Sequence, residues 1–333
     1  MSLAVSASSA ASAANAAAAT LRVASKQTIA DGVVGLTLVD PAGGRLQDWA
    51  PGAHIDLILT SADGAQYTRQ YSLCGDRRDA SSYNVAVLRE PAGRGGSAYV
   101  HEHLLEGHLV GVGGPRNNFA LVPASRYLFV AGGIGITPIL PMIAAAERLG
   151  ADWSLLYGGR SRTSMGFLSE LNKYGNRVQV CPQDETGLLD LNGAIGEHDS
   201  STTKIYCCGP APLLNALEAA TTGWPPGTVR TERFVPKEQN APARTTPFVV
   251  TLARTGTSVT VDPNESILDA LDRDGVKVLS SCKEGTCGTC ETSVLDGTPD
   301  HRDSLLSDAE RERGDCMFVC VSRSVDDQLV LDL

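Results

Sequence analysis

The N-terminal part of the chain alternates short apolar runs with turn residues. Segments 33–39, 54–59 and 83–88 show this alternation, and stretches rich in Pro and Gly separate them. Several short strands at such spacing are typical of a small antiparallel barrel. We therefore predict a β-barrel domain over residues 21–124.

Residues 1–20, which precede this domain, are dominated by Ala and Ser. They lack the basic start and the strong apolar core of a secretory signal. We expect a disordered or weakly helical tail outside the folded part of the chain.

From residue 125 the pattern changes to continuous apolar strands that alternate with helical segments. This alternation predicts an α/β domain with a doubly wound parallel sheet, which we place at residues 125–236. The predicted strands cover 127–131, 153–161 and 204–208, and the predicted helices cover 139–149 and 211–220.

A third domain follows a polar, proline-containing segment at 237–246, which is typical of a linker. Residues 248–253 and 258–261 predict two strands joined by a Thr-Gly turn, and capping residues mark a helix start within 262–271. We predict a C-terminal α+β domain over residues 247–333.

Charge is distributed unevenly along the chain of 333 residues, whose net charge is −10. Residues 247–333 hold 8 Lys and Arg against 17 Asp and Glu, a balance of −9, so the other residues contribute only −1. An acidic C-terminal domain suits solubility or steering toward a basic partner. No basic patch favours nucleic acid, and no run of about eighteen apolar residues predicts a membrane span.

The clearest chemical signal is the cysteine spacing in the C-terminal domain. Cys282, Cys287 and Cys290 form C-x4-C-x2-C, the plant-type ligand pattern of a [2Fe–2S] cluster. Gly285 and Gly288 supply the positive-φ freedom that such a loop needs to wrap around inorganic sulfide. The nine cysteines show no repeating spacing, which favours a reducing, cytoplasmic compartment and a metal role for some of them.

The fourth ligand lies downstream, where both Cys316 and Cys320 occur. Plant-type ferredoxins, which this segment resembles, place their fourth cysteine at a buried strand end. Because Cys320 has that setting, we predict it as the ligand and Cys316 as a small buried residue. A structural zinc site and a disulfide framework are the alternatives to an iron–sulfur cluster at these cysteines.

Two glycine-rich turns precede predicted helices. Residues 132–138, with the sequence GGIGITP, join an apolar strand to a helix, as in the opening of a nucleotide-binding βαβ unit. Residues 93–97 precede a helical pattern, and free N–H groups at such a junction can bind an anion. Ser97 is predicted as the N-cap of that helix.

Four motifs in the first two domains, including the glycine-rich turn at 132–138, give a family resemblance. The sequence RQYSL at 69–73 resembles the flavin signature of the ferredoxin–NADP reductase superfamily, and GGIGITP resembles its dinucleotide motif. The sequence CGP at 208–210 resembles the segment that approaches the nicotinamide in this superfamily. The sequence ERF at 232–234 resembles the segment whose aromatic ring lies against the flavin. With the C-terminal β-grasp ferredoxin pattern, residues 21–333 resemble the phthalate dioxygenase reductase and vanillate O-demethylase reductase family.

The resemblance implies FMN, NADH and a [2Fe–2S] cluster as cofactors. Phe234, Cys208 and Ser72 would take part at the flavin and nicotinamide rings. The residues implied for FMN and its phosphate are Arg69, Tyr71, Ser72, Arg89, Gly95, Gly96, Ser97 and Phe234. Those implied for the dinucleotide are Gly132, Gly133, Gly135, Thr137, Pro138, Arg160, Cys208, Gly209 and Pro210. The cluster ligands would be Cys282, Cys287, Cys290 and Cys320.

Electron counting gives these cofactors an order. A nicotinamide delivers two electrons as hydride, the cluster accepts one, and a flavin can hold two and release them singly. The family's usual acceptor is a Rieske non-haem iron oxygenase that hydroxylates aromatic rings or demethylates. A donor to another acceptor, an iron–sulfur scaffold or sensor without a working flavin site, and FAD in place of FMN remain alternatives.

The choice between NADH and NADPH depends on the residues after the strand at 153–161. No Asp or Glu stands there to accept from ribose hydroxyls, whereas Arg160 and Arg162 could contact a 2′-phosphate. The motif Y-x-G-R-S resembles NADH-dependent members, so we expect NADH.

Overall fold

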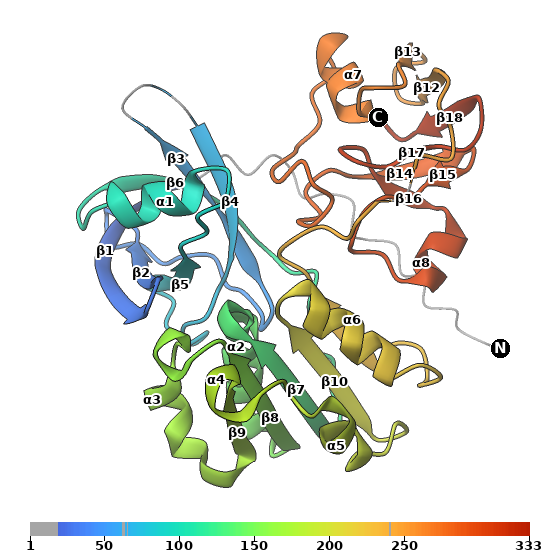
Figure 1. Ribbon diagram of the computed structural model, residues 1–333. Coiled ribbons are helices and arrows are strands. Elements are labelled where there is room, and N and C mark those ends of the chain that lie inside the picture. The colour runs from blue at the N-terminus through green and yellow to red at the C-terminus, as the bar shows by residue number, and fades with distance from the viewer. Residues whose placement is uncertain (1–18, 62–63, 65, 240) are drawn as a thin grey trace, which may run out of the picture.

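The computed structural model describes residues 19–61, 64, 66–239 and 241–333. Three larger sheets succeed one another along the chain: a six-stranded sheet, a five-stranded parallel sheet and a C-terminal five-stranded sheet (Figure 1). A two-stranded sheet of β15 (Pro299–Asp300) and β17 (Arg323–Ser324) completes the C-terminal domain. The predicted tail at residues 1–20 falls mostly outside the described residues. Its last two residues, Ala19 and Thr20, already belong to the first strand.

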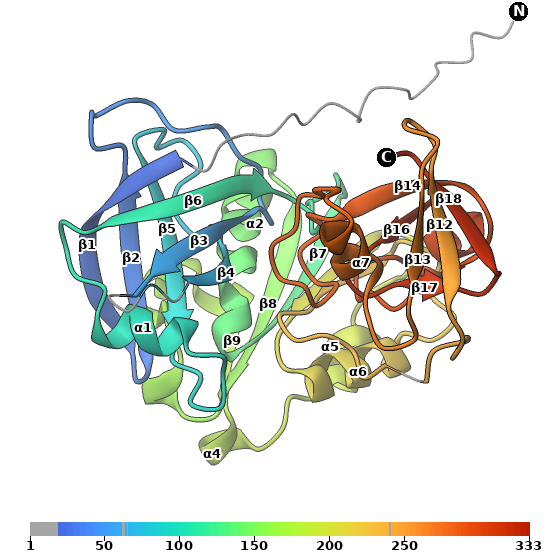
Figure 2. The ribbon, with the colours of Figure 1, turned by 90° about the horizontal axis from the view of Figure 1, so that it is seen from above.

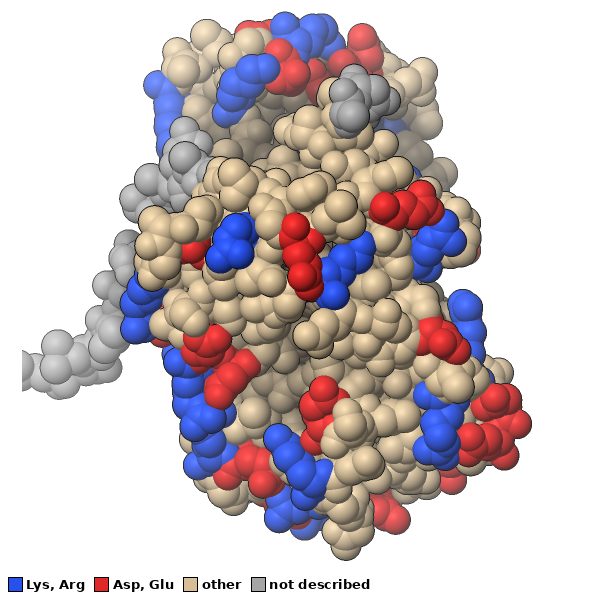
Figure 3. Space-filling view, turned by 90° about the vertical axis from the view of Figure 1, so that its left-hand side faces the viewer, with Lys and Arg blue, Asp and Glu red and all other residues tan. Residues whose placement is uncertain are grey.

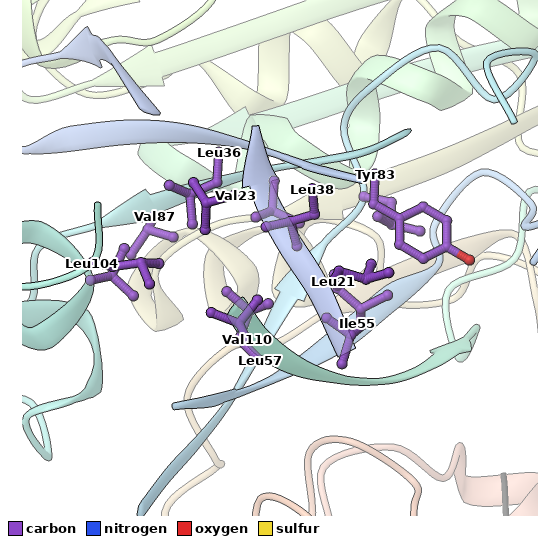
Figure 4. Packing of buried hydrophobic residues seen from close by; sticks show 14 of the residues in the cluster. Leu21, Val23, Leu36, Leu38, Ile55, Leu57, Tyr83, Val87, Leu104 and Val110 are labelled. Carbon is purple, nitrogen blue, oxygen red and sulfur yellow. The ribbon is translucent and has the colours of Figure 1, made fainter. Parts of the chain in front are cut away.

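The N-terminal sheet closes into an antiparallel barrel. Its strand order is β4-β3-β6-β1-β2-β5, and a bridge between Leu73 and Val85 joins the two edges. Alternate strand residues such as Val23, Leu38 and Leu57 point inward and fill the core (Figure 4). The elements are β1 (Ala19–Ala30), β2 (Val33–Val39), β3 (His54–Thr60), β4 (Gln66–Ser72), β5 (Ser82–Leu88), α1 (Gly96–Glu102) and β6 (Leu109–Arg116).

The middle domain has a parallel sheet in the order β11-β10-β7-β8-β9, with helices connecting its strands. Its strands are β7 (Arg126–Gly132), β8 (Asp152–Gly159), β9 (Val178–Pro182), β10 (Thr203–Cys208) and β11 (Val229–Glu232). Its α-helices are α2 (Ile136–Leu149), α3 (Leu168–Leu171), α4 (Gln183–Thr186), α5 (Leu191–Gly196) and α6 (Ala211–Ala220), and 3-10 turns lie at Gly133–Gly135, Arg162–Ser164 and Asn172–Arg177.

The C-terminal domain packs one helix on a mixed sheet in the order β13-β12-β18-β14-β16. That helix starts after Ser266, whose hydroxyl accepts a hydrogen bond from the Asp269 N–H. The elements are β12 (Phe248–Leu252), β13 (Ser258–Val261), α7 (Ile267–Arg273), β14 (Glu291–Asp296), β15 (Pro299–Asp300), α8 (Asp308–Arg313), β16 (Cys316–Phe318), β17 (Arg323–Ser324) and β18 (Gln328–Leu331).

The C-terminal domain lies beside both other domains (Figures 1 and 2). On the face formed by the barrel and the middle domain, Lys and Arg alternate with Asp and Glu (Figure 3), in keeping with the small net charge of residues 1–246. None of the helices in the described residues has the length and apolar character needed to cross a membrane.

Candidate functional site

A polar pocket lies where the three domains meet. Strands β3 and β4 carry His54 and Ser72 side by side, because these two residues are register partners. The end of β11 and the cysteine loop supply the other walls. The lining residues are His54, Arg69, Gln70, Ser72, Arg94, Glu232, Arg233, Phe234, Glu284, Thr286 and Cys287.

Strand β4 presents the predicted flavin motif to this pocket. Arg69 donates from Nη2 to the Arg94 carbonyl at 2.6 Å. Burial raises the pKa of Tyr71 to about 12, so its hydroxyl stays protonated. Ser72 is only 4% exposed, and its hydroxyl has no hydrogen-bond partner among the described residues. A buried hydroxyl without a partner is costly unless a ligand satisfies it.

The glycine-rich loop lies against the same strand. Gly95 has φ 81°, and a Cβ built at Gly96 would lie 2.7 Å from Cγ of Arg69. The loop backbone therefore approaches the arginine stem in a way that side chains would prevent. Together with the unpartnered Ser72 hydroxyl, this cradle fits a flavin with its phosphate beside the arginine.

Two details of that loop differ from the prediction. The N-cap of α1 is Gly95, and Ser97 lies inside the helix, where its hydroxyl accepts a hydrogen bond from the Glu90 N–H at 3.1 Å. The prediction of Ser97 as N-cap was wrong because glycine adopts the left-handed conformation needed at this position. Arg89 forms an ion pair with Glu102 on α1, so its predicted role at the phosphate remains a prediction.

The two nucleotide motifs meet at the carboxyl edge of the parallel sheet. A Cβ at Gly132 would lie 2.7 Å from Cδ of Pro210, and one at Gly135 would lie 2.2 Å from the Cys208 carbonyl oxygen. Only glycine permits this contact between the turn after β7 and the turn after β10. Thr137 is buried at the start of α2 and donates to the Ile134 carbonyl at 2.9 Å. Of the remaining predicted residues, Gly133 and Gly209 lie in these two turns, and Pro138 lies in the first turn of α2.

Beyond β8, the structure brings a carboxylate to one of the two arginines. Arg162 forms an ion pair with Glu185 of helix α4 at 2.7 Å. Arg160 is exposed and has no ion pair among the described residues. No Asp or Glu directly follows β8 in the sequence, but Glu185 reaches Arg162 from the segment after β9.

Glu232 is a pocket residue that the sequence prediction left without a role. It ends β11, and the Cys208 thiol lies 3.9 Å from its Oε2. Burial raises the pKa of Glu232 to about 8, so this carboxyl carries a proton near neutral pH. Phe234, two residues later, lines the pocket and is 42% exposed. A proton-bearing carboxyl, a thiol and an accessible ring thus adjoin the flavin strand.

The four predicted cluster cysteines converge in the C-terminal domain. Cys282, Cys287, Cys290 and Cys320 are all buried, and none forms a disulfide. Hydrogen bonding with Cys287 and Cys320 lowers the pKa of the Cys282 thiol, and hydrogen bonding with Cys320 lowers that of Cys290. Four thiols within hydrogen-bonding reach of one another fit the ligand set of a cluster.

The backbone of this loop turns toward the sulfur atoms. The Glu284 N–H donates to Sγ of Cys282 at 3.3 Å, and Gly285 and Gly288 have φ values of 69° and 77°. The predicted positive-φ glycines are thus confirmed. Cys316 stays apart on β16, opposite Ser293 of β14. Among the described residues, no group of three or more His, Cys, Asp or Glu side chains is arranged so that it could hold a single metal ion.

His54 is a second pocket residue that sequence reasoning missed. It is 5% exposed, and its Nε2 has no partner among the described residues. Burial first, and then Arg116, lowers its pKa to about 4, so the ring is neutral at pH 7. The available signal was the pair His54 and Asp56, polar residues inside an otherwise apolar strand.

The chain is similar to known proteins in its C-terminal domain and over most of its length. Residues 250–325 match the family model of the 2Fe-2S iron-sulfur cluster binding domain. The chain is 45% identical over 316 residues to a phenoxybenzoate dioxygenase subunit beta from Ectopseudomonas oleovorans, covering 94% of this chain and 97% of that protein.

Two solved structures resemble the whole chain. One is a phthalate dioxygenase reductase, described as a modular structure for electron transfer from pyridine nucleotides to [2Fe–2S], with TM-score 0.68 and 38% identity over 95% of this chain and 98% of that one. The other is an intact type IV self-sufficient cytochrome P450 monooxygenase, with TM-score 0.88 and 42% identity. The match covers 95% of this chain but only 41% of the P450 chain.

Proposed function

The chain belongs to the phthalate dioxygenase reductase family, and on this premise we propose that it passes electrons from NADH through FMN and a [2Fe–2S] cluster to a Rieske-type oxygenase. The observation that carries the proposal is the shared pocket. Thr286 and Cys287 of the cluster loop line the same cavity as Arg69 and Ser72 of the flavin strand. A flavin held there would adjoin the cluster directly, without a second protein between them.

The residues of the pocket have distinct proposed tasks. Arg69 and the Gly95–Gly96 backbone hold the flavin phosphate, and the unpartnered Ser72 hydroxyl hydrogen-bonds the flavin ring. When bound, a flavin accepts two electrons together from a nicotinamide and releases them one at a time to the cluster. Phe234 shields the pocket and gives way to the nicotinamide ring.

We propose that the dinucleotide lies along the meeting turns of Gly135 and Cys208. Its pyrophosphate is held over the start of α2, where the backbone N–H groups of the helix point outward. We expect NADH, because Glu185 neutralises Arg162 and gives this edge a carboxylate that can accept from ribose hydroxyls.

The acceptor is proposed to dock on the C-terminal domain. This domain carries almost all of the chain's net negative charge, which suits a basic partner surface. Cys320 lines a second surface hollow with Asn264 and Val321, and none of these three residues lines the flavin pocket. We propose that the electron leaves the cluster through this hollow. A cytoplasmic location completes the proposal, in keeping with nine unpaired cysteines.

A second candidate acceptor is a cytochrome P450. The similarity to a self-sufficient P450 chain, with TM-score 0.88, favours it. The two acceptors can be distinguished by mixing the NADH-reduced protein with each. A P450 substrate complex under carbon monoxide would develop its haem–CO band, whereas a Rieske oxygenase would show the paramagnetic resonance signal of its reduced cluster.

The proposal is tested by a visible spectrum of the purified protein before and after anaerobic NADH, with the released flavin identified. We expect flavin and iron–sulfur bands that both bleach with NADH, and FMN on release. Bleaching with NADPH but not NADH would reverse the nucleotide assignment. A colourless protein would favour a zinc site at the cysteines and contradict the electron-transfer proposal. Release of FAD would show that the flavin is FAD and not FMN.

A further inference from the structure

The cluster loop is fastened to the barrel by side chains from three places. Asn118, just after β6, donates from Nδ2 to the Cys287 carbonyl at 2.9 Å. Gln70, within the flavin motif of β4, donates to the Ser281 hydroxyl at 2.6 Å. Arg94, in the glycine-rich loop, forms an ion pair with Glu284 at 2.8 Å. All three partners lie within residues 281–287: Ser281 and Glu284 lie beside or between the cluster ligands, and the third is the backbone carbonyl of the ligand Cys287.

The contact at Ser281 is built around a buried carboxylate. Asp56 of β3 is 5% exposed, and its Oδ1 accepts hydrogen bonds from Gln70 and from the Ser281 hydroxyl, both at 2.8 Å. Arg116 forms an ion pair with its other oxygen at 2.6 Å. Removing one of these partners would leave the buried Asp56 carboxylate uncompensated, which is costly. The buried charge therefore stabilises all of these contacts.

The contact at Asn118 is equally close. A Cβ built at Gly288 would lie 2.6 Å from Nδ2 of Asn118, so the amide packs directly on the loop backbone. Asn118 itself is exposed, and β6 and Phe119, which is buried in the middle domain, anchor its backbone on either side. The asparagine therefore ties the cluster loop to a segment whose backbone is anchored on both sides.

We propose that Asn118 and the Asp56–Gln70–Ser281 group are positioning residues for electron transfer. They hold the cluster loop at a fixed separation from the flavin strand throughout turnover. The C-terminal domain then does not swing between donor and acceptor. This inference rests on the proposed function, because it assigns to these contacts the flavin-to-cluster step.

Positioning matters here because the rate of electron transfer falls steeply with the separation of the two centres. The contacts touch no reacting atom, so they act only through that separation. Gln70 lies between Arg69 and Tyr71, so the strand that holds the flavin and the residue preceding Cys282 are joined by one hydrogen bond.

The test compares wild type with N118A, N118D, S281A and the double variant N118A/S281A. N118D keeps the shape of the side chain but replaces the donor by an acceptor facing a carbonyl, so it should behave like N118A. Q328A is the matched control, because this exposed amide donates only within its own domain, to Thr251 at 2.9 Å.

Hydrogen exchange is the first measurement, because it does not depend on activity. Loss of one hydrogen bond worth about 1 kcal/mol should raise the opening of residues 281–288 about fivefold. In rapid mixing with NADH, bleaching of the flavin band should be unchanged, while bleaching of the cluster band slows severalfold and slows most in the double variant. The paramagnetic resonance spectrum of the reduced cluster should stay as in wild type, since no ligand is altered.

Normal exchange and normal cluster reduction in N118A, S281A and the double variant would overturn the inference. An altered resonance spectrum in these variants would also overturn it, because the contacts would then shape the cluster itself. Failure of the proposed function looks different: wild type would then not bleach with NADH at all.

Discussion

Gly135 lies directly against the carbonyl group of Cys208, where a Cβ would come within 2.2 Å of the oxygen. The turn after β7 and the turn after β10 thus share one backbone contact at the carboxyl edge of the sheet. This contact brings the two dinucleotide motifs together, although Gly135 and Cys208 lie 73 positions apart in the sequence.

Gly135→Ala should force these two turns apart. Overpacking of this kind costs about 1–3 kcal/mol, so we expect a lower melting temperature and a raised KM for NADH. Gly196→Ala is the control, because nothing lies within 4 Å of a Cβ there. An unchanged KM in a folded Gly135→Ala protein would show that the turns do not have to touch for binding.

The local motifs explain why so much of the fold and site was predictable. The strand–turn–helix at residues 132–138 and the cysteine spacing are written in consecutive residues, and the three-domain fold class is confirmed. Gly285 and Gly288 have the predicted positive φ.

The unpredicted residues reach the site through tertiary structure. Asn118, His54 and Glu185 lie in no motif, and Glu232 opens the ERF segment without a predicted role. Each gains its role only when a distant segment folds beside it. The error at Ser97 has a local cause: Ser and Gly are both common N-caps, and the left-handed φ of Gly95 decided between them.

Ser72→Ala should separate flavin binding from folding. The Ser72 hydroxyl is buried without a partner, so its removal should leave the flavin-free protein as stable as wild type or more stable. Flavin should bind about fivefold more weakly, because one hydrogen bond is worth about 1 kcal/mol. Fluorescence titration and thermal melting measure the two effects. Ser169→Ala, at an exposed position, is the control, and equal flavin affinity in both variants would remove Ser72 from the site.

Cys290→Ser and Cys316→Ser form a matched pair. Cys290 converges with the other cluster thiols, whereas Cys316 sits on β16, where burial raises its pKa to about 11 and keeps it a thiol. We expect Cys290→Ser to lose iron, sulfide and the iron–sulfur absorption while keeping flavin. Cys316→Ser should keep all three. Loss of the cluster in Cys316→Ser would reopen the choice of the fourth ligand.

Glu185→Gln should shift nucleotide preference toward NADPH. Glu185 accepts two hydrogen bonds from Arg162, at 3.1 and 2.7 Å. Without this carboxylate the guanidinium is free to meet a 2′-phosphate, and we expect the ratio of kcat/KM for NADPH over NADH to rise about two- to fivefold, as for an exposed ion pair. Asp184→Asn, at the neighbouring exposed position, should leave the ratio unchanged. An unchanged ratio in Glu185→Gln would place the adenosine ribose elsewhere.

Glu232→Gln should change how stability depends on pH. Burial raises the pKa of Glu232 to about 8 from 4.5, and the Cys208 thiol beside it opposes that shift only in part. The folded state therefore binds the proton more tightly than the unfolded state. This contribution is complete below pH 4.5 and is lost as pH rises toward 8, by up to about 1.4 kcal/mol per pH unit.

A glutamine keeps the shape of the protonated carboxyl but cannot ionise. The melting temperature of Glu232→Gln should therefore equal that of wild type near pH 5, exceed it increasingly from pH 6 to pH 8, and exceed it by a constant amount above pH 8. Glu170→Gln, at an exposed position on α3, controls for a general charge effect, since it should follow wild type across the range. If the melting temperatures of wild type and Glu232→Gln changed with pH in parallel, Glu232 would be ionised in the folded protein at neutral pH. The pocket would then present a carboxylate to the nicotinamide instead of a protonated carboxyl group.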